Sequence, residues 1–284
     1  MAKYISTEPL PVGVSEAEFQ CERDGLTIRG TEYRRAGERL PIAVVSHGIR
    51  AWQATVRHYA VALAELGYVA YTFDFCGGCA PGKGKSDGDS TDMSVLTEVE
   101  DLLRVIACAK SRPYTDPSRV LLMGCSQGGF VSAITAARLG EEVEALILLY
   151  PALCIPDDLR AGRLLEGTFD PVNLPETIPC GSFLLGRRYV EDMAGADAFQ
   201  LIRGFPGDVL LVYGDADRAV DLSYSQRAYQ LYRERSAGTG GPRTRLEVMV
   251  GGGHGFTEAE SREVIRYMRA VSYTHLTLPT ILRV

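Results

Sequence analysis

Residues 124–129 read Gly-Cys-Ser-Gln-Gly-Gly and match the pattern G-x-S-x-G, which can present a serine for nucleophilic attack. A short apolar run, 120–123, precedes this motif, and a helical pattern, 127–139, follows it. A sharp turn between a strand and a helix exposes the serine hydroxyl, and its glycine neighbours allow chain segments to approach closely. The helix N-terminus also favours negative charge that develops beside it. We therefore expect Ser126 to be a nucleophile.

A serine hydroxyl needs a general base to become a good nucleophile at neutral pH. When the serine lies on such a strand-to-helix turn, the acid and then the histidine follow it along the chain. The sequence contains four histidines. His47 and His58 precede Ser126, and His275 lies within residues 271–284, which we interpret below as a non-native tail. We therefore expect His254, within Gly-Gly-Gly-His-Gly-Phe, to accept the serine proton and pass it to the leaving group.

Two neighbouring carboxylates compete to orient the imidazole and to stabilise its charged form. Both follow the apolar run 208–213, in the sequence Tyr-Gly-Asp-Ala-Asp. We favour Asp217, because Asp215 comes first after the strand and is expected to shape the turn. Asp221 is a third candidate, but it suits better the N-cap of the helix that the following residues predict.

Acyl transfer also requires hydrogen-bond donors for a developing oxyanion. One donor should be the backbone N–H of Gln127, the residue after the nucleophile. The other should come from the loop after the apolar run 42–46, which reads Ser-His-Gly-Ile, and we expect it to be the N–H of Ile49. His47 would then hold this loop through side-chain hydrogen bonds, with direct proton transfer by His47 as the alternative.

Apolar runs of strand length alternate with helical patterns along the chain. The expected strands cover residues 19–21, 26–33, 42–46, 69–73, 120–123, 145–149, 208–213 and 246–250. The expected helices cover residues 55–66, 94–110, 127–139, 221–232 and 257–270. This order predicts an α/β fold with a mostly parallel, doubly wound sheet after an antiparallel N-terminal hairpin. In such sheets the ligand chemistry lies at the carboxyl ends of the strands.

Residues 151–206 separate two expected strands that a short helix could join. Connections of this length without a function are uncommon. The segment is rich in proline and in large apolar residues. We interpret it as a cap folded over the strand ends, and an ordinary surface excursion is the alternative.

Length, composition and charge limit the classes of function. The chain has 284 residues, is 46% hydrophobic and carries a net charge of −6, which is compatible with one domain over residues 1–270. No block of Lys and Arg suggests a nucleic-acid partner, and no apolar run approaches the ~20 residues that cross a bilayer. With no signal peptide apparent, we expect a cytoplasmic protein without a membrane partner, either a monomer or a homodimer.

The seven cysteines are expected to be reduced thiols, because their number is odd and no export signal is apparent. Cys76-Gly-Gly-Cys79 has the spacing of a zinc or redox motif. No second pair and no neighbouring histidine in the sequence complete a metal site. We therefore expect no metal.

The C-terminal residues 271–284 read Val-Ser-Tyr-Thr-His-Leu-Thr-Leu-Pro-Thr-Ile-Leu-Arg-Val and resemble translated sequencing-adaptor sequence. The preceding amphipathic pattern ends there without a capping signal. We interpret residues 271–284 as a non-native tail and expect the last helix to end at Ala270. A genuine irregular terminus is the alternative.

The motifs together resemble bacterial cinnamoyl (feruloyl) esterases of the α/β-hydrolase superfamily. The resemblance rests on His47-Gly48, on the stretches 73–75, 85–88 and 93–101, and on the serine motif. It implies the α/β-hydrolase fold, a catalytic triad matching Ser126, Asp217 and His254, and no metal or organic cofactor.

In the same family the cap binds the aromatic acyl group, and an Asp and a Tyr contact its ring hydroxyl. The resemblance places these roles on Asp158 and Tyr189, with Asp157 as the alternative to Asp158. This chain departs from the family at Ile49, at Cys125 and in the stretch 76–84, which affects the expected substrate more than the expected reaction.

The sequence therefore predicts a serine carboxylic-ester hydrolase that forms an acyl-enzyme with small esters, aryl or hydroxycinnamoyl esters among them. The enzymatic alternatives are a prolyl-oligopeptidase-like serine peptidase and a thioesterase. A binding protein on an inactive hydrolase scaffold is the non-enzymatic alternative.

Overall fold

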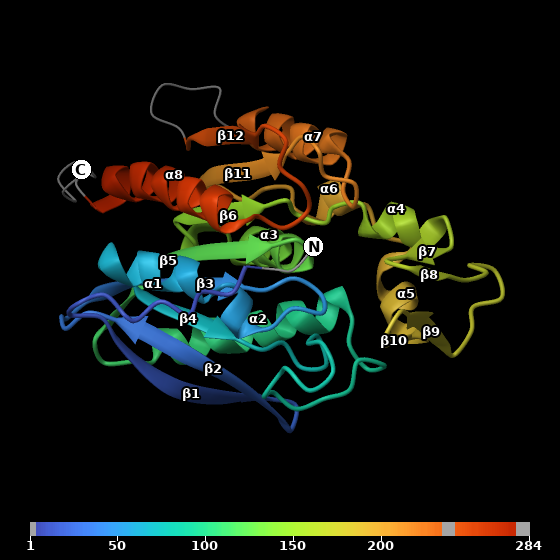
Figure 1. The fold of residues 1–284 in the computed structure, drawn as a ribbon, viewed down its shortest axis with the longest axis horizontal. Helices are drawn as coiled ribbons and strands as arrows, with labels where there is room; N and C mark the ends of the chain where they lie inside the picture. Colours follow the sequence, from blue (N-terminus) through green and yellow to red (C-terminus); the bar gives the residue numbers. More distant parts are fainter. Residues whose placement is uncertain (1–3, 235–241, 277–284) are drawn as a thin grey trace.

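The computed structural model describes residues 4–234 and 242–276, with side chains described as far as residue 270. A twisted sheet crosses this part of the chain in the strand order β1-β2-β4-β3-β5-β6-β11-β12 (Figure 1). The strands are β1 Ser15–Arg23, β2 Leu26–Arg34, β3 Leu40–Ser46, β4 Val69–Phe73, β5 Thr115–Cys125, β6 Ala145–Leu149, β11 Asp208–Gly214 and β12 Thr244–Met249. Strand β2 pairs antiparallel with β1 and with β4, and the other pairs are parallel. The predicted mostly parallel sheet with an antiparallel N-terminal hairpin is confirmed.

The central strands are buried on both faces, which explains their unbroken apolar sequences. Every residue of β4 and of β6 is buried. Strand β1, at the edge of the sheet, exposes most of its residues and has an alternating polar sequence instead. The strands that carry the candidate site are therefore held in the core, with their carboxyl ends at one edge.

Helices cover both faces of the sheet and create two apolar cores. Helices α1 Arg57–Glu65 and α8 Glu258–Leu276 pack on one face, where Leu63, Val264 and Met268 are fully buried. Helices α2 Val95–Lys110, α3 Gln127–Leu139 and α7 Leu222–Arg233 pack on the other face. Short 3-10 turns, Gln53–Thr55 and Gly140–Glu142, precede α1 and follow α3. Within the described residues, no helix is long and apolar enough to cross a membrane.

The last helix differs from its expected boundary. It was expected to end at Ala270, and in the structure α8 continues to Leu276. The β-branched residues Val271 and Thr274 each make a helix less stable than alanine would by less than about 1 kcal/mol, which is too little to end it. The first strong helix breaker is Pro279, which lies with the rest of 277–284 outside the described residues.

The cap segment, residues 151–206, lies beyond the carboxyl ends of the parallel strands (Figure 1). It contains α4 Ile155–Arg160, β7 Arg163–Leu164, β8 Gly167–Thr168, β9 Thr177–Cys180, β10 Phe183–Gly186, α5 Arg187–Met193 and α6 Ala198–Leu201. Most of its large apolar side chains are buried, whereas Leu165 and Leu184 are 44% and 41% exposed. The Ser94 hydroxyl, at the start of α2, donates to Asp192 of the cap segment at 2.5 Å. The cap segment is therefore packed against the rest of the fold.

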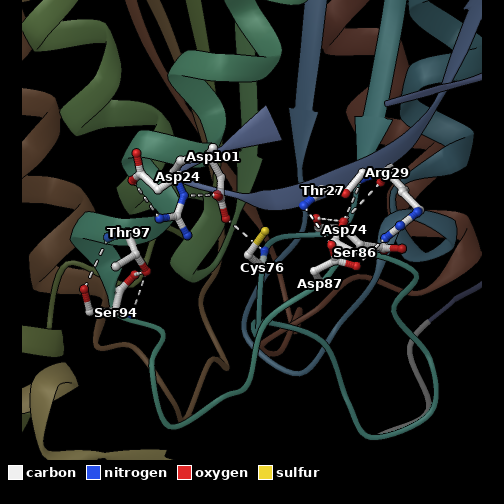
Figure 2. Close-up of polar contacts among 11 residues, drawn as sticks. Asp24, Thr27, Arg29, Asp74, Cys76, Ser86, Asp87, Ser94, Thr97 and Asp101 are labelled. Carbon is white, nitrogen blue, oxygen red and sulfur yellow. Dashed lines mark hydrogen bonds and ion pairs between the residues drawn. The ribbon is translucent and has the colours of Figure 1, made fainter. Parts of the chain in front are cut away.

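The long loop between β4 and α2 is fixed by the polar contacts in Figure 2. The Asp87 carboxylate accepts from the Thr27 backbone and from the Arg29 guanidinium of β2. The Asp101 carboxylate of α2 accepts from the backbone N–H of Cys76 at 2.9 Å. At the N-terminus of α2, Ser94 and Thr97 exchange side-chain to backbone hydrogen bonds in a capping box. These contacts attach the loop to β2 and to α2.

Candidate active site

Ser126 lies on a tight turn between β5 and α3, with φ 52° and ψ −122°. Backbone of this kind is strained for any residue with a side chain and persists where the surrounding structure enforces it. Two glycines allow the turn. A Cβ on Gly124 would lie 2.1 Å from the carbonyl oxygen of Gly128, and one on Gly128 would lie 2.2 Å from that of His47. The predicted need for small residues around the serine therefore has a direct steric cause.

Ser126, His254 and Asp217 form one hydrogen-bonded line. The Ser126 hydroxyl oxygen is 2.8 Å from Nε2 of His254, and Nδ1 of His254 is 2.8 Å from Oδ2 of Asp217. The Asp217 side chain is fully buried, whereas that of His254 is 28% exposed. A carboxylate at Nδ1 favours the tautomer with its proton on that nitrogen, which leaves Nε2 to accept from the serine.

The three candidate carboxylates have different partners. Asp217 contacts the imidazole through one oxygen, and its other oxygen accepts from the backbone N–H groups of Ala219 and Val220 at 2.8 and 3.0 Å. Asp215 accepts from the Gly251 backbone at 2.6 Å and so joins two loops. Asp221 caps α7. Of the three, Asp217 is the one that reaches His254.

Tyr150 packs beside the imidazole, a contact that the sequence did not predict. Its ring centroid is 5.0 Å from that of His254 and 4.8 Å from that of Phe256, both in edge-to-face geometry. Tyr150 has φ 38° and its backbone N–H donates to the Val212 carbonyl at 2.8 Å. A tyrosine directly after a buried strand was the only signal in the sequence, and it does not reveal this contact with a distant loop.

The loop after β3 makes a tight turn against the nucleophile. The Gly48 carbonyl accepts from the backbone of Ala51 at 3.0 Å and is 2.8 Å from Nδ1 of His47. In a trans peptide the N–H points opposite to the carbonyl, so these two contacts also fix the direction of the Ile49 N–H. A Cβ on Gly48 would lie only 3.0 Å from Cβ of Ser126. The turn that carries Ile49 is thus positioned by contacts on both sides.

His47 is fully buried and occupied at both ring nitrogens. Nε2 accepts from the backbone N–H of Phe75 at 3.1 Å, so Nδ1 carries the proton and donates to Gly48. These contacts agree with the expectation that His47 holds the loop through its side chain.

His47, Asp74 and Cys79 are a group that could hold a metal ion, since their ligand atoms all lie within 4.8 Å of one another. The sequence does not reveal this group, because His47 lies far along the chain from Cys79 and only the fold brings the two together. The ligand atoms are already used within the protein. The Asp74 oxygens accept from the backbone N–H groups of Gln53 and Lys85 at 2.7 and 2.9 Å, and burial raises the pKa of the Cys79 thiol. In this arrangement the three side chains support the loop after β3 through hydrogen bonds of their own.

Two cavities meet at Ser126. One, of about 440 Å³, lies under the cap segment and is lined by Gln127, Asp158 and Tyr189. The other, of about 530 Å³, lies between the loop after β3 and the loop of His254, and is lined by Tyr59, Tyr150 and Phe256. Volumes of this size suit small organic groups. Each of the two cavities can therefore hold one half of a substrate whose reacting bond lies at Ser126.

The residues expected to contact an aromatic ring both line the cavity under the cap segment. Tyr189 is fully buried, and its hydroxyl donates to the side-chain carbonyl of Gln127 at 2.6 Å. The Asp158 carboxylate accepts from the Arg163 guanidinium at 3.0 Å. The alternative residue, Asp157, instead accepts from Tyr224 at 2.5 Å and does not line this cavity.

An ion pair joins the cap segment to the turn after β3. The two terminal guanidinium nitrogens of Arg50 donate to the Glu166 carboxylate, at 2.7 and 3.0 Å, and one of them also donates to the Cys180 carbonyl. Arg50 directly follows Ile49 and has φ 55°. The cap segment is therefore tied to the backbone next to the expected oxyanion donor.

Residues 38–173 match the family described as serine aminopeptidase, S33. The chain is 23% identical over 247 residues to an acylamino-acid-releasing enzyme of Rattus norvegicus, covering 84% of this chain and 32% of that one. It is 30% identical over 145 residues to thiohydrolase apmlB of Arthrinium phaeospermum, covering 50% of this chain and 44% of that one. The chain thus spans less than half the length of these curated relatives.

Among solved structures, the ferulic acid complex of Est1E from Butyrivibrio proteoclasticus superposes with a TM-score of 0.79 at 24% identity. The match covers 90% of this chain and 99% of that one. At this identity the likeness establishes the fold. Together with the sheet order described above, it confirms the expected α/β-hydrolase fold.

Proposed function

We propose that the protein is a serine carboxylic-ester hydrolase whose triad is Ser126, His254 and Asp217. The observation that carries this proposal is the continuous line of 2.8 Å contacts from the serine hydroxyl through the imidazole to a buried carboxylate. It lies at the carboxyl ends of parallel strands, where this fold class concentrates its chemistry. The matches to hydrolases support the same reaction class.

The first half-reaction forms an acyl-enzyme. His254 takes the proton from Ser126 as its oxygen attacks the ester carbonyl, and Asp217 stabilises the imidazolium that results. The N–H groups of Gln127 and Ile49 hold the oxyanion, which develops as the carbonyl carbon becomes tetrahedral. Because the contacts to Gly48 already orient the Ile49 peptide, little reorganisation accompanies the reaction.

The first half-reaction ends when the ester C–O bond breaks and His254 gives its proton to the departing alcohol. The second half-reaction repeats the chemistry with water. In it, His254 accepts a proton from the water that attacks the acyl-enzyme. The bond between the acyl carbon and the Ser126 oxygen then breaks, His254 returns the proton to that oxygen, and the carboxylic acid leaves. Apart from the water, these steps use side chains and backbone groups of the chain itself.

We propose small aryl or hydroxycinnamoyl esters as substrates, with the acyl group under the cap segment. The cavity there offers apolar walls, the Tyr189 hydroxyl and the Asp158 carboxylate, which suit a ring that bears a hydroxyl. Est1E, whose fold this chain shares, was solved with ferulic acid bound, and ferulic acid is an acid of this chemistry.

The test is turnover of a short p-nitrophenyl ester by the parent protein and by Ser126→Ala. We expect the variant to lose at least about 10³-fold in kcat, because the covalent step is removed. Equal turnover by both proteins would reject the proposal. A panel of short acyl, long acyl and hydroxycinnamoyl esters then identifies the preferred acyl group.

Peptide hydrolysis is the second candidate, favoured by the names of the matched family and of the rat relative. The same triad can cleave amides, so the choice depends on how the leaving amine is bound and protonated. Hydrolysis of Xaa-Pro amides but not of esters would favour this candidate.

A further inference from the structure

The two cavities at Ser126 have different walls. Both reach Leu165, Arg218 and His254. Gln127 lines only the cavity under the cap segment, whereas Gly255 and Phe256, which follow the base along the chain, line only the other one. We call this second cavity the base-side cavity.

The charges of the two cavities also differ. In the base-side cavity Arg50 is neutralised by Glu166, and Arg218 adds one uncompensated positive charge. In the cavity under the cap segment, Asp158 is paired with Arg163, and the lining also includes Asp221, a carboxylate that the base-side cavity does not have. Burial lowers the pKa of His58, another residue of the base-side cavity, to about 4, so it stays neutral near pH 7. The base-side cavity alone therefore has a net positive wall.

Arg218 is available to a ligand. Among the residues that the structure describes, it is the one cation lining either cavity that has no ion pair and no hydrogen bond. Arg218 is exposed and directly follows Asp217 in the sequence. Both carboxylate oxygens of Asp217 already have partners, which are His254 and two backbone N–H groups. A guanidinium with no partner of its own can bind a carboxylate in bidentate geometry.

The proposed reaction decides which half of the substrate meets this charge. The alcohol must leave toward the residue that protonates it, His254, and the loop after this residue lines the base-side cavity. The acyl half then occupies the cavity that contains Gln127. Tyr150 and Phe256 give the base-side cavity an aromatic wall, and the Arg50–Glu166 pair lies at its border with the cap segment.

We propose that the base-side cavity binds the leaving alcohol and that Arg218 selects alcohols that carry a carboxylate. This inference rests on the proposed esterase function and adds a substrate class to it: esters of hydroxy acids, with an apolar or ring-shaped body between the hydroxyl and the carboxylate. Arg218 contacts the substrate and sets specificity without taking part in proton transfer.

The test compares two leaving groups on one acyl group, the 3-carboxyphenyl and 3-carbamoylphenyl esters of cinnamic acid. They differ in charge but little in shape. We expect the parent to prefer the carboxylate about fivefold in kcat/KM, a magnitude typical of an exposed ion pair. Arg218→Gln should bring the ratio of the two kcat/KM values to about one, and Arg218→Lys should retain part of the preference. Arg203→Gln, which changes an exposed arginine outside both cavities, should keep the parent's ratio.

A parent ratio of one, or a ratio that Arg218→Gln does not change, would overturn the inference. Another result would also overturn it: a fivefold higher kcat/KM for methyl 4-carboxycinnamate than for the corresponding carboxamide, two esters in which the carboxylate or carboxamide is on the acyl half. The dissociation constants of both phenyl esters for Ser126→Ala supply a readout that needs no turnover. If the parent hydrolyses no ester, the proposed function fails, and this binding ratio still decides on the carboxylate site.

Discussion

Replacing Asp217 by asparagine gives a sharp test of the proposed triad, because the structure dictates how the new amide must sit. One Asp217 oxygen accepts from the backbone N–H groups of Ala219 and Val220, and the other faces Nδ1 of His254. In Asp217→Asn the amide oxygen must stay on the two backbone donors. Its NH₂ group then faces Nδ1, which has to accept a hydrogen bond, so the proton moves to Nε2 and His254 can no longer accept from the serine.

The expected loss in kcat follows from the free energy of the alternative orientation of the amide in Asp217→Asn, in which its oxygen faces Nδ1 of His254. Turning the amide over would restore the productive tautomer but would leave two backbone donors facing an NH₂ group, at about 1–3 kcal/mol for each unsatisfied donor. The productive orientation is thus disfavoured by roughly 2–6 kcal/mol, which corresponds to a loss of about 30-fold to 10⁴-fold in kcat. Because both backbone hydrogen bonds survive in the main orientation, the melting temperature should change by only a few degrees.

The assay is kcat for a p-nitrophenyl ester at neutral pH, with the melting temperature measured on the same preparations. Asp215→Asn is the matched control, because Asp215 joins the Gly251 loop and does not contact the imidazole. We expect this control to lose less than about tenfold in kcat. If Asp217→Asn keeps more than a tenth of the parent's kcat, or if Asp215→Asn loses as much activity, the assignment of the acid is refuted.

Three further predictions concern the surroundings of the site. Gly48→Ala places a Cβ 3.0 Å from Cβ of Ser126 and 3.2 Å from the Cys125 carbonyl oxygen, so it should displace the reacting groups and lower kcat about tenfold or more. Gly195→Ala is the control, because a Cβ there meets open space and should leave kcat unchanged. Equal effects of the two substitutions on kcat would contradict the steric argument. Glu166→Gln breaks the pair with Arg50 and should lower kcat/KM by up to about fivefold at low salt, with a smaller deficit near 0.5 M salt; a deficit independent of salt would show that the pair does not act through its charge. Burial raises the pKa of Glu98 well above its ordinary 4.5, so the folded parent binds a proton that the unfolded chain has lost and becomes less stable as pH rises above that value. Glu98→Gln does not titrate, and its advantage in free energy of unfolding should grow between about pH 5 and 8 by at most about 1.4 kcal/mol per pH unit; urea titrations that show a constant or shrinking advantage would contradict this.

The sequence was sufficient to predict the sheet and the nature of the turn at Ser126. Buried strands have unbroken apolar sequences, and G-x-S-x-G between a strand and a helix has few structural interpretations. The antiparallel N-terminal hairpin and the N-cap role of Asp221 were also predictable, because the sequence signals for turns and caps act over a few residues.

Contacts between distant loops could not be predicted in the same way. The Arg50–Glu166 pair joins residues 116 positions apart, and neither neighbouring sequence indicates the other. The pairing of His47 with the Phe75 backbone and the packing of Tyr150 on His254 depend on how loops meet at the strand ends. Helix α8 extends beyond its expected end at Ala270, because residues of low helix propensity are not by themselves enough to end a helix.

The central claim is that Ser126 becomes acylated during turnover. The most direct measurement is peptide mapping by mass spectrometry after reaction of the folded protein with a fluorophosphonate, with residual esterase activity followed in the same samples. We expect one phosphonyl group per chain, on the peptide containing Ser126, with labelling and loss of activity advancing together and no such label on Ser126→Ala. Loss of activity without modification of Ser126, or full activity in a fully labelled protein, would contradict it.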